Sequence, residues 1–187
     1  ASRGLGDVYK RQTTGHGIIG KHNLSKHNLT FRETSVLLNS RLKLDGSMNL
    51  MRQVVKNKPT VGGFYMNPLV GLYRFPRGED ISYYKENFEV YDEGRNLNIQ
   101  NWHTSYEDFE QNPYWITNRI LSKENRMHVI VSLSANLKIN DWLSLQARGN
   151  VDYINDKVRQ QFYASTAPAL AGANGRYIEM DYQETQY

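Results

Sequence analysis

The chain has 187 residues, which is enough for one ordinary domain, so its length excludes no class of protein. Only 39% of the residues are hydrophobic, and no apolar run approaches the roughly 20 residues that a membrane-spanning helix needs, which excludes a helical membrane protein. The net charge of +4 comes from Lys and Arg scattered among acids, which indicates no nucleic-acid partner, and the lack of cysteine excludes a disulfide scaffold.

The start of the chain does not read as part of a folded domain. Residues 4–12, GLGDVYKRQ, resemble a translated sequencing-adapter tail. We interpret residues 1–12 as a non-native leader and expect the native domain to cover residues 13–187. A native disordered tail is the alternative.

Two strands are predicted next, over residues 28–38 and 42–54, with a short turn near Asn39 and Ser40. The second strand alternates cleanly, since Leu42, Leu44, Gly46, Met48 and Leu50 share one face. In the first strand the alternation breaks at Glu33 and Ser35. That break predicts a bulge, a register shift or a lumen-facing stretch.

A second predicted hairpin has strands at residues 125–138 and 142–155. Each arm has one apolar and one polar face, and each is about as long as a membrane-crossing strand of 9–11 residues. Trp142 stands at the turn, where an aromatic residue of a membrane interface belongs. These patterns predict an all-β fold.

The connections predict how these strands are arranged. Each hairpin has a short turn, whereas a segment of roughly 55 residues, 56–112, separates the hairpins, and a long loop is expected after Asn155. In bacterial barrels short turns face the periplasm and long loops face the outside. We therefore expect antiparallel strands of a transmembrane β-barrel, about four strands of a larger barrel, with long extracellular loops.

Five loop segments form a recognisable ordered set: residues 67–78 (NPLVGLYRFPRG), 91–96 (YDEGRN) with 98–102 (NIQNW), 111–115 (QNPYW), 141–145 (DWLSL) and 163–166 (YAST). Together they resemble the SusC/RagA family of TonB-dependent outer-membrane transporters. The similarity runs in order from about Gly15 to Tyr177, and it implies that the chain is an internal fragment of such a receptor.

The resemblance implies a barrel of about 22 strands with an N-terminal plug, located in the cell outer membrane. It also implies the partners: a SusD-like surface lipoprotein, an oligosaccharide or peptide ligand, outer-membrane lipid, and the TonB complex acting through an N-terminal part that this sequence lacks. Neither a cofactor nor an enzymatic activity is expected.

Aromatic residues mixed with Asn and Arg outside the strands are the candidates for ligand or partner contact, because flat rings beside amide and guanidinium donors suit sugars and peptides. For at least half of them, packing of the loop against itself is the alternative. The candidates are Tyr65, Asn67, Tyr73, Arg74, Phe75, Tyr84, Trp102, Tyr114 and Trp115.

Three other patterns suggest chemistry that their contexts do not support. Residues 15–20 match G-x-G-x-x-G, but no apolar strand precedes and no helix is expected to follow, so we expect a loop tip. The nearby histidines lack metal-site spacing, so no metal site is expected. The carboxylates of Glu107, Asp108 and Glu110 are neighbours on a loop, which is poor evidence for a glycosidase pair.

The preferred function is import of oligosaccharides or peptides across the outer membrane with a SusD-like partner. The alternative is a soluble secreted β-domain that binds glycans, and an enzyme acting on carbohydrates ranks last. A soluble domain would need a second sheet to cover the apolar stripe.

Overall fold

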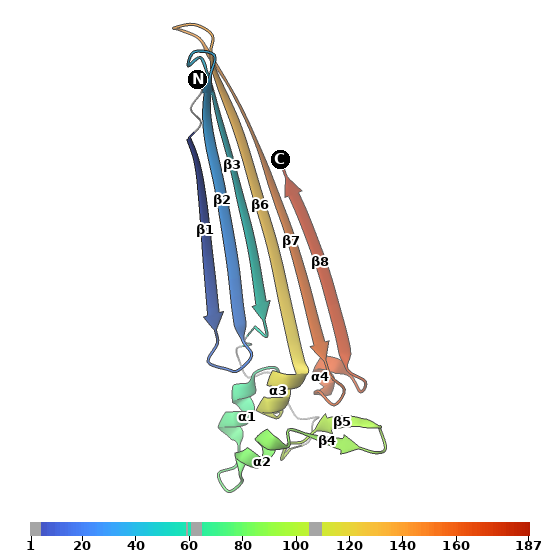
Figure 1. The fold of residues 1–187 in the computed structure, drawn as a ribbon. Coiled ribbons are helices and arrows are strands. Elements are labelled where there is room, and N and C mark those ends of the chain that lie inside the picture. Colours follow the sequence, from blue (N-terminus) through green and yellow to red (C-terminus); the bar gives the residue numbers. More distant parts are fainter. Residues whose placement is uncertain (1–4, 59, 61–64, 105–109) are drawn as a thin grey trace.

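The computed structural model describes residues 5–58, 60, 65–104 and 110–187. Most of it is one antiparallel sheet of six strands, in the order β1-β2-β3-β6-β7-β8 (Figure 1). The strands of this sheet are β1 (Leu5–His16), β2 (Asn23–Leu37), β3 (Leu42–Lys56), β6 (Ile120–Lys138), β7 (Ser144–Phe162) and β8 (Arg176–Gln186).

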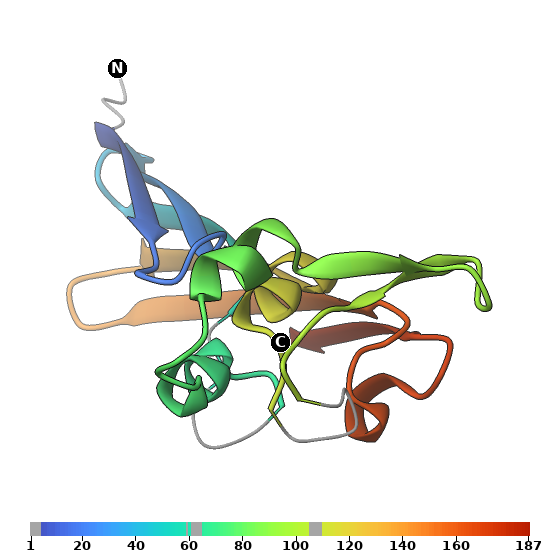
Figure 2. The ribbon, with the colours of Figure 1, turned by 90° about the horizontal axis from the view of Figure 1, so that it is seen from below.

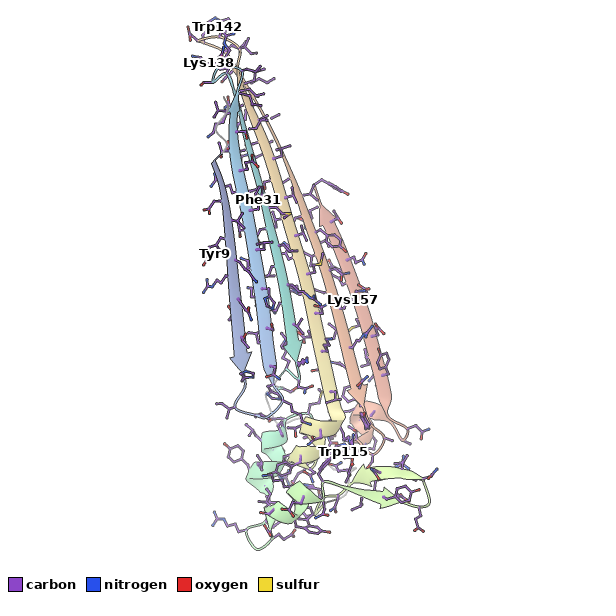
Figure 3. All side chains as sticks on the ribbon, in the orientation of Figure 1. Tyr9, Phe31, Trp115, Lys138, Trp142 and Lys157 are labelled. Carbon is purple, nitrogen blue, oxygen red and sulfur yellow. The ribbon has the colours of Figure 1, made fainter. Side chains whose placement is uncertain are left out.

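The two ends of the sheet carry different connections (Figure 1). At one end, short turns join β2 to β3 and β6 to β7, and Leu38, Asn39 and Ser40 adopt positive φ in the first of them. At the other end, long connections join β3 to β6 and β7 to β8, and the short segment 17–22 joins β1 to β2. We call these the turn end and the loop end. Trp142 and Lys138 lie at the turn end and Trp115 at the loop end (Figure 3).

The connections at the loop end are themselves folded. We call the described parts of residues 57–119 and 163–175 the loop layer, which is seen from below in Figure 2. No helix of the described residues is long and apolar enough to cross a membrane. The elements of the loop layer are α1 (Pro68–Arg74), α2 (Ile81–Glu86), the two-stranded sheet of β4 (Glu89–Asp92) and β5 (Leu97–Gln100), α3 (Pro113–Arg119) and α4 (Pro168–Ala171).

The four strands predicted from sequence are confirmed as β2, β3, β6 and β7. Their ends at the turns agree with the prediction to within two residues. At the loop end β2 begins at Asn23, β6 begins at Ile120, and β7 continues to Phe162, well past Asn155. The antiparallel all-β class is therefore confirmed, and the strands are longer than the pattern indicated.

The expectation of about four strands is wrong for this chain, because β1 and β8 extend the sheet on either side. β1 includes most of the segment that we set aside as a leader, and it pairs with β2 from Leu5↔Thr34 to His16↔Asn23. The non-native origin of residues 1–12 stays a prediction. β8 pairs with the loop-end half of β7.

The expected irregularity at Glu33 and Ser35 is also wrong. The pairing of β2 with β3 is continuous from Asn23↔Lys56 to Leu37↔Leu42, so the strand neither bulges nor changes register. Glu33 lies on the same face as Phe31, which is the apolar face. Its direct neighbours on β1 and β3 are Gly6 and Gly46, and the absence of side chains there leaves room for the stem of the exposed glutamate.

The strand register collects the apolar residues of different strands into rows on one face of the sheet. One row runs across five strands through Val8, Phe31, Met48, Val131 and Val151. On β7, the apolar face carries no charged residue from Leu145 to Tyr153, a length of about 27 Å at ~3.4 Å per residue. We call this stretch and its partners on the neighbouring strands the apolar band.

The apolar band is open to the surroundings. Leu133 and Leu145 are 61% and 60% exposed, and Val131 is 40% exposed. The helices and the small sheet lie at the loop end and leave this face uncovered (Figures 1 and 2). Monomeric soluble proteins rarely expose a continuous apolar surface of this extent.

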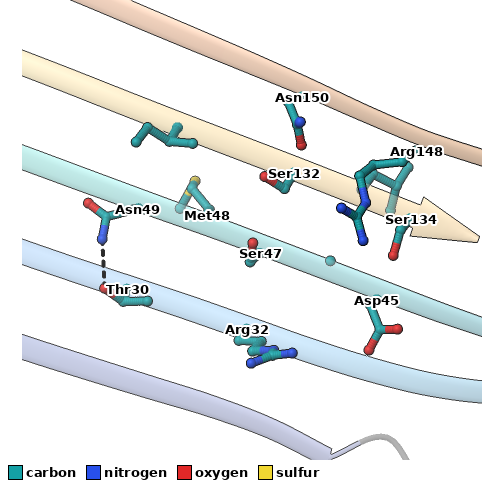
Figure 4. A pocket seen from close by; sticks show the side chains of 13 residues that line it. Thr30, Arg32, Asp45, Ser47, Met48, Asn49, Ser132, Ser134, Arg148 and Asn150 are labelled. Atoms are coloured by element: carbon teal, nitrogen blue, oxygen red, sulfur yellow. Dashed lines mark hydrogen bonds between the residues drawn. The ribbon is translucent and has the colours of Figure 1, made fainter.

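The opposite face is polar and hollow. A depression of about 590 Å³ is lined by side chains of β2, β3, β6 and β7, including Arg32, Asp45, Arg148 and Asn150 (Figure 4). The Thr34 hydroxyl donates to the Asp45 carboxylate at 2.6 Å, and Lys43 lies 3.5 Å from the same group. The register places Lys43, Asp45, Arg148 and Asp152 together on this polar face.

A small hydrophobic core joins the sheet to the loop layer. It consists of Ile116 from α3, Ile120 and Phe162 at the loop ends of β6 and β7, and Ala171 from α4, all less than 9% exposed. Since α3 ends at Arg119 and β6 begins at Ile120, no linker separates the helix from its strand. The loop layer is thus attached to β6 and β7 by direct packing.

Candidate functional site

Asn or Asp residues begin α1, α2 and α3 of the loop layer. The Asn67 side chain accepts a hydrogen bond from the Leu69 backbone N–H at 3.0 Å at the start of α1, and Asp80 accepts one from Ser82 at 2.8 Å at the start of α2. α1 and α3 each have Pro at their first turn, where a missing N–H costs nothing. The predicted contact residue Asn67 therefore has a structural role as a helix cap.

Two buried amides, Gln111 and Asn112, connect segments from all over the loop layer. Asn112 is 0% exposed, and its side-chain N–H groups donate to the carbonyls of Tyr84 and Asn101 at 3.0 and 2.7 Å. Its oxygen caps α3 by accepting from the Tyr114 N–H at 2.8 Å. A buried side chain that satisfies three backbone groups fixes the positions of all three segments.

Gln111 makes the second set of these connections. Its amide N–H donates to the Tyr65 carbonyl at 2.5 Å, and its oxygen accepts from the Ala167 N–H at 2.9 Å. Ala167 precedes α4, so this one residue joins the start of the β3–β6 connection to the β7–β8 connection. We call Gln111 and Asn112 the amide pair.

Further bonds between the two long connections surround the amide pair. The Trp115 indole N–H donates to the Thr166 hydroxyl at 3.1 Å, and Trp115 is only 1% exposed. The Gln100 backbone N–H donates to the Ser165 hydroxyl at 3.0 Å, and both residues are buried. The NIQNW, QNPYW and YAST segments, which are far apart in the sequence, therefore meet at one place.

Close packing of α1 against this region requires a glycine. A Cβ added at Gly71 would lie 2.5 Å from the Gln111 carbonyl oxygen and 3.2 Å from the Pro113 ring. On the other side, Arg119 donates two hydrogen bonds of 2.7 Å to the Glu89 carboxylate and so fixes β4 to α3. Those hydrogen bonds raise the pKa of the Arg119 guanidinium above its ordinary value.

Aromatic side chains form a second cluster beside α2. The ring of Trp102 has its centroid 5.3 Å from Phe75, 5.2 Å from Tyr84 and 4.7 Å from His103. These spacings are those of packed aromatic pairs. Burial and a hydrogen bond to Glu79 raise the pKa of the Tyr84 phenol.

Glu110 lies under this aromatic cluster with a side chain that is 4% exposed. One carboxylate oxygen is 2.9 Å from His103 Nε2 and accepts from the Trp102 indole N–H at 3.3 Å, and the other is 3.1 Å from Arg74. Since a buried carboxylate needs partners of this kind, the group fixes Arg74 and Trp102 in place. Glu107 and Asp108, the other members of the predicted acidic group, lie outside the described residues.

The predicted contact residues occupy three environments. Trp115 is buried, and Asn67, Arg74, Phe75, Tyr84 and Trp102 are tied into the clusters described above. Tyr65 and Tyr114 are half-buried. Tyr73 is the most exposed of the nine, at 86%, and the side chain of Arg74 is 53% exposed. Most of the nine predicted contact residues therefore pack within the loop layer. Contact with a ligand stays a prediction for all nine.

The remaining sequence patterns lie in the hairpin of β1 and β2. Gly15 and His16 end β1, and residues 17–22 turn directly into β2, so the G-x-G-x-x-G match is followed by a strand, as expected. His16 is hydrogen-bonded to Asn23 and His27 to Ser25. In the part of the chain that the structure describes, no three His, Cys, Asp or Glu residues are grouped to hold a metal.

Gln100, Gln111, Ser165 and Thr166 organise the layer, yet sequence reasoning did not single out any of them by its role. Their partners are backbone groups, a hydroxyl and the Trp115 indole, most of them distant in sequence, and no local pattern reveals such pairs. The Asn-Pro pairs at 67–68 and 112–113 were the available signal, because Asn before Pro is a typical helix start.

No family model and no curated protein sequence matches this chain. The fold and the candidate site define its class at a coarser level. It is an antiparallel β protein whose two-faced sheet carries a hydrogen-bonded layer of loops at one end.

Proposed function

We propose that this chain forms part of the wall and the outer loops of an outer-membrane β-barrel transporter of the SusC/RagA kind, which imports oligosaccharides or peptides. The apolar band carries this proposal. It is exposed across the sheet, and the opposite face is polar and hollow, which is the arrangement of a barrel wall between lipid and a polar lumen.

The dimensions of the apolar band support a membrane location. Its length of about 27 Å corresponds to about 20 Å across the bilayer at the usual 35–45° strand tilt, close to the ~25 Å apolar belt of outer-membrane barrels. Tyr153 lies at its loop-end edge, and Trp142 lies in the turn beyond its other edge (Figure 3). Aromatic residues favour both interfaces of a membrane.

The loop layer supports the assignment of a binding role. Its internal hydrogen bonds hold Tyr73 on the surface at the loop end, and Tyr83 and Tyr91 are 53% and 60% exposed. Aromatic rings held by a rigid scaffold suit the flat faces of sugars and the side chains of peptides. A SusD-like lipoprotein is the expected partner at this end of the sheet.

A soluble glycan-binding β-domain is the second candidate, and the same exposed tyrosines favour it. That fold must cover the apolar band with another layer. In the described residues the loop layer lies at the end of the sheet instead (Figure 1). The two functions therefore predict different surroundings for Leu133: lipid in a transporter, and another layer of protein in a soluble domain.

The test uses the absence of cysteine from the chain. Leu133→Cys and Ser132→Cys, which lie on opposite faces at the same height, are spin-labelled in the protein reconstituted in bilayers. We expect collisions with lipid-soluble oxygen to dominate at position 133 and collisions with a water-soluble nickel chelate to dominate at position 132. A label at position 133 that meets neither reagent is covered by protein, which contradicts the membrane proposal.

Sequencing of the flanking genomic region provides an independent test of the transporter assignment. A plug-coding region upstream in the same reading frame and a gene for a SusD-like lipoprotein downstream are expected. Flanks that encode a soluble secreted enzyme would contradict it.

A further inference from the structure

Cationic residues continue the apolar face beyond the apolar band, toward the loop end. The strand register places Lys56 of β3, Lys123 of β6 and Arg159 of β7 directly opposite one another in neighbouring strands. Like charges in direct cross-strand pairs destabilise a sheet. Three in one row therefore need compensation.

Only one of these three cations is compensated within the described chain. Arg159 lies 2.8 Å from Glu179 of β8, and in the adjacent row Lys157 lies 2.9 Å from Asp181. Lys56 and Lys123 are exposed, and the described residues place no carboxylate within ion-pair distance of either ammonium group.

Arg52 on the same face resembles Lys56 and Lys123 in having no acidic partner among the described residues. Arg52 of β3 lies between the apolar band and the row of Lys56, and it is exposed without a described acidic partner. We call Arg52, Lys56 and Lys123 the basic group. On β8 acids match the cations of β7, whereas the basic group on β3 and β6 has no such match, so its charge is available to an external anion.

The height of the basic group above the apolar band indicates which anion it meets. Arg52 follows Leu50 by two residues, which is about 7 Å along the strand, and Lys56 is about 20 Å from Leu50. At the usual tilt the two lysines stand about 15 Å above the hydrocarbon layer, and their flexible stems allow the ammonium groups to reach back toward it. The headgroup layer is about 5–7 Å thick on each side of a bilayer, so Arg52 lies at its depth and the two lysines extend toward it from above.

We propose that the basic group binds phosphate groups of anionic lipid headgroups in the membrane leaflet at the loop end. The inference rests on the proposed membrane location of the sheet. The acyl chains of the same lipid would lie against the apolar band just below, so one molecule contacts both surfaces. Its phosphate accepts charge-assisted hydrogen bonds and relieves the repulsion between Lys56 and Lys123.

The test measures lipid selectivity by electron spin resonance, in phosphatidylcholine bilayers that contain the reconstituted protein. The readout is the association of spin-labelled phosphatidylglycerol relative to spin-labelled phosphatidylcholine. The variant combines Arg52→Gln, Lys56→Gln and Lys123→Gln. The matched control combines Arg32→Gln, Lys26→Gln and Lys43→Gln, which removes one Arg and two Lys from the polar face of β2 and β3.

We expect the preference for phosphatidylglycerol to fall about fivefold or more in the basic-group variant, since each cation near an anionic surface contributes about 1 kcal/mol. The control should keep the preference. An unchanged preference in the basic-group variant, or an equal loss in the control, contradicts the proposal. Loss of the preference in the parent protein on adding millimolar inorganic phosphate would assign the site to a free anion instead.

The oxygen collisions of a spin label at position 133 show whether only the headgroup site fails or the proposed membrane location fails as well. A protein whose label meets lipid but that shows no preference for phosphatidylglycerol keeps the membrane location and loses the headgroup site. A protein whose label meets no lipid loses both.

Discussion

Replacing Leu133 with Arg tests which face of the sheet contacts lipid and where along the apolar band the midplane of the bilayer lies. Leu133 pairs with Gly149, which is halfway between Leu145 and Tyr153 on β7, so it lies at the centre of the apolar band. Its side chain is 61% exposed, which leaves an arginine there in contact with lipid. An Arg on the lipid face at the midplane costs about 2–4 kcal/mol.

Two companion substitutions set the scale. Leu145→Arg places the same charge at the turn-end edge of the apolar band, about 10 Å from the midplane, where the cost falls to about 0–1 kcal/mol. Ser132→Arg keeps the depth of Leu133 but points into the polar hollow beside Asn150 (Figure 4), so it should cost much less than Leu133→Arg.

The assay is reversible urea unfolding of the reconstituted protein, followed by tryptophan fluorescence. The free energy of unfolding should fall in the order wild type, Ser132→Arg and Leu145→Arg, then Leu133→Arg. Equal losses for Leu133→Arg and Ser132→Arg would refute the assignment of faces. Equal losses for Leu133→Arg and Leu145→Arg would leave the faces intact but refute the position of the midplane.

Three further predictions concern the loop layer. Asn112→Ala should destabilise it by roughly 2–4 kcal/mol, because buried carbonyls and a helix start lose their partner, seen as faster amide hydrogen exchange there but not in β6. Gly71→Ala should separate α1 from α3, since its Cβ would lie 2.5 Å from the Gln111 carbonyl, and limited proteolysis should cut near α1 faster than in wild type. Tyr73→Ala should weaken ligand uptake or lipoprotein capture and leave hydrogen exchange unchanged; normal uptake and capture would restrict Tyr73 to a passive role.

The sequence predicted the sheet well where the strands have one apolar and one polar face. The alternation is clear from Leu145 to Tyr153 and stops there. Beyond Tyr153 the apolar face carries Lys157 and Arg159, while Ile154 and Val158 are on the other face, so the pattern inverts within one strand. No single period-2 pattern describes all 19 residues of β7, which is why the prediction ended at Asn155 and missed residues 156–162.

The edge strands were missed for different reasons. β8 has a readable alternation, in which Ile178, Met180 and Tyr182 share a face, but it follows a long connection that we had extended to the end of the chain. β1 falls largely within the segment that resembles an adapter sequence, and that resemblance predicts no strand. Pairing with β2 satisfies the backbone groups on one edge of this segment whatever its origin.

The candidate site was predicted as a set of residue types but not as an arrangement. Aromatic and Asn-rich composition correctly located the segments that form the loop layer. Which rings are buried depends on hydrogen bonds between residues far apart in the sequence, such as the bond from Gln100 to Ser165, 65 positions away. Composition carries no information about such pairs, so Trp115 and Tyr73 looked equivalent in the sequence although one is 1% and the other 86% exposed.

The way the loop layer is attached bears on how it would bind a ligand. A structureless connection of this length would have to be ordered on binding, and the lost conformational entropy would weaken the affinity. Here α3 runs directly into β6, and the amide pair and the Trp115–Thr166 bond connect it to the β7–β8 connection. The backbone that carries Tyr73 is therefore held from two sides before any ligand arrives, so binding energy at this residue need not be spent on ordering the loop.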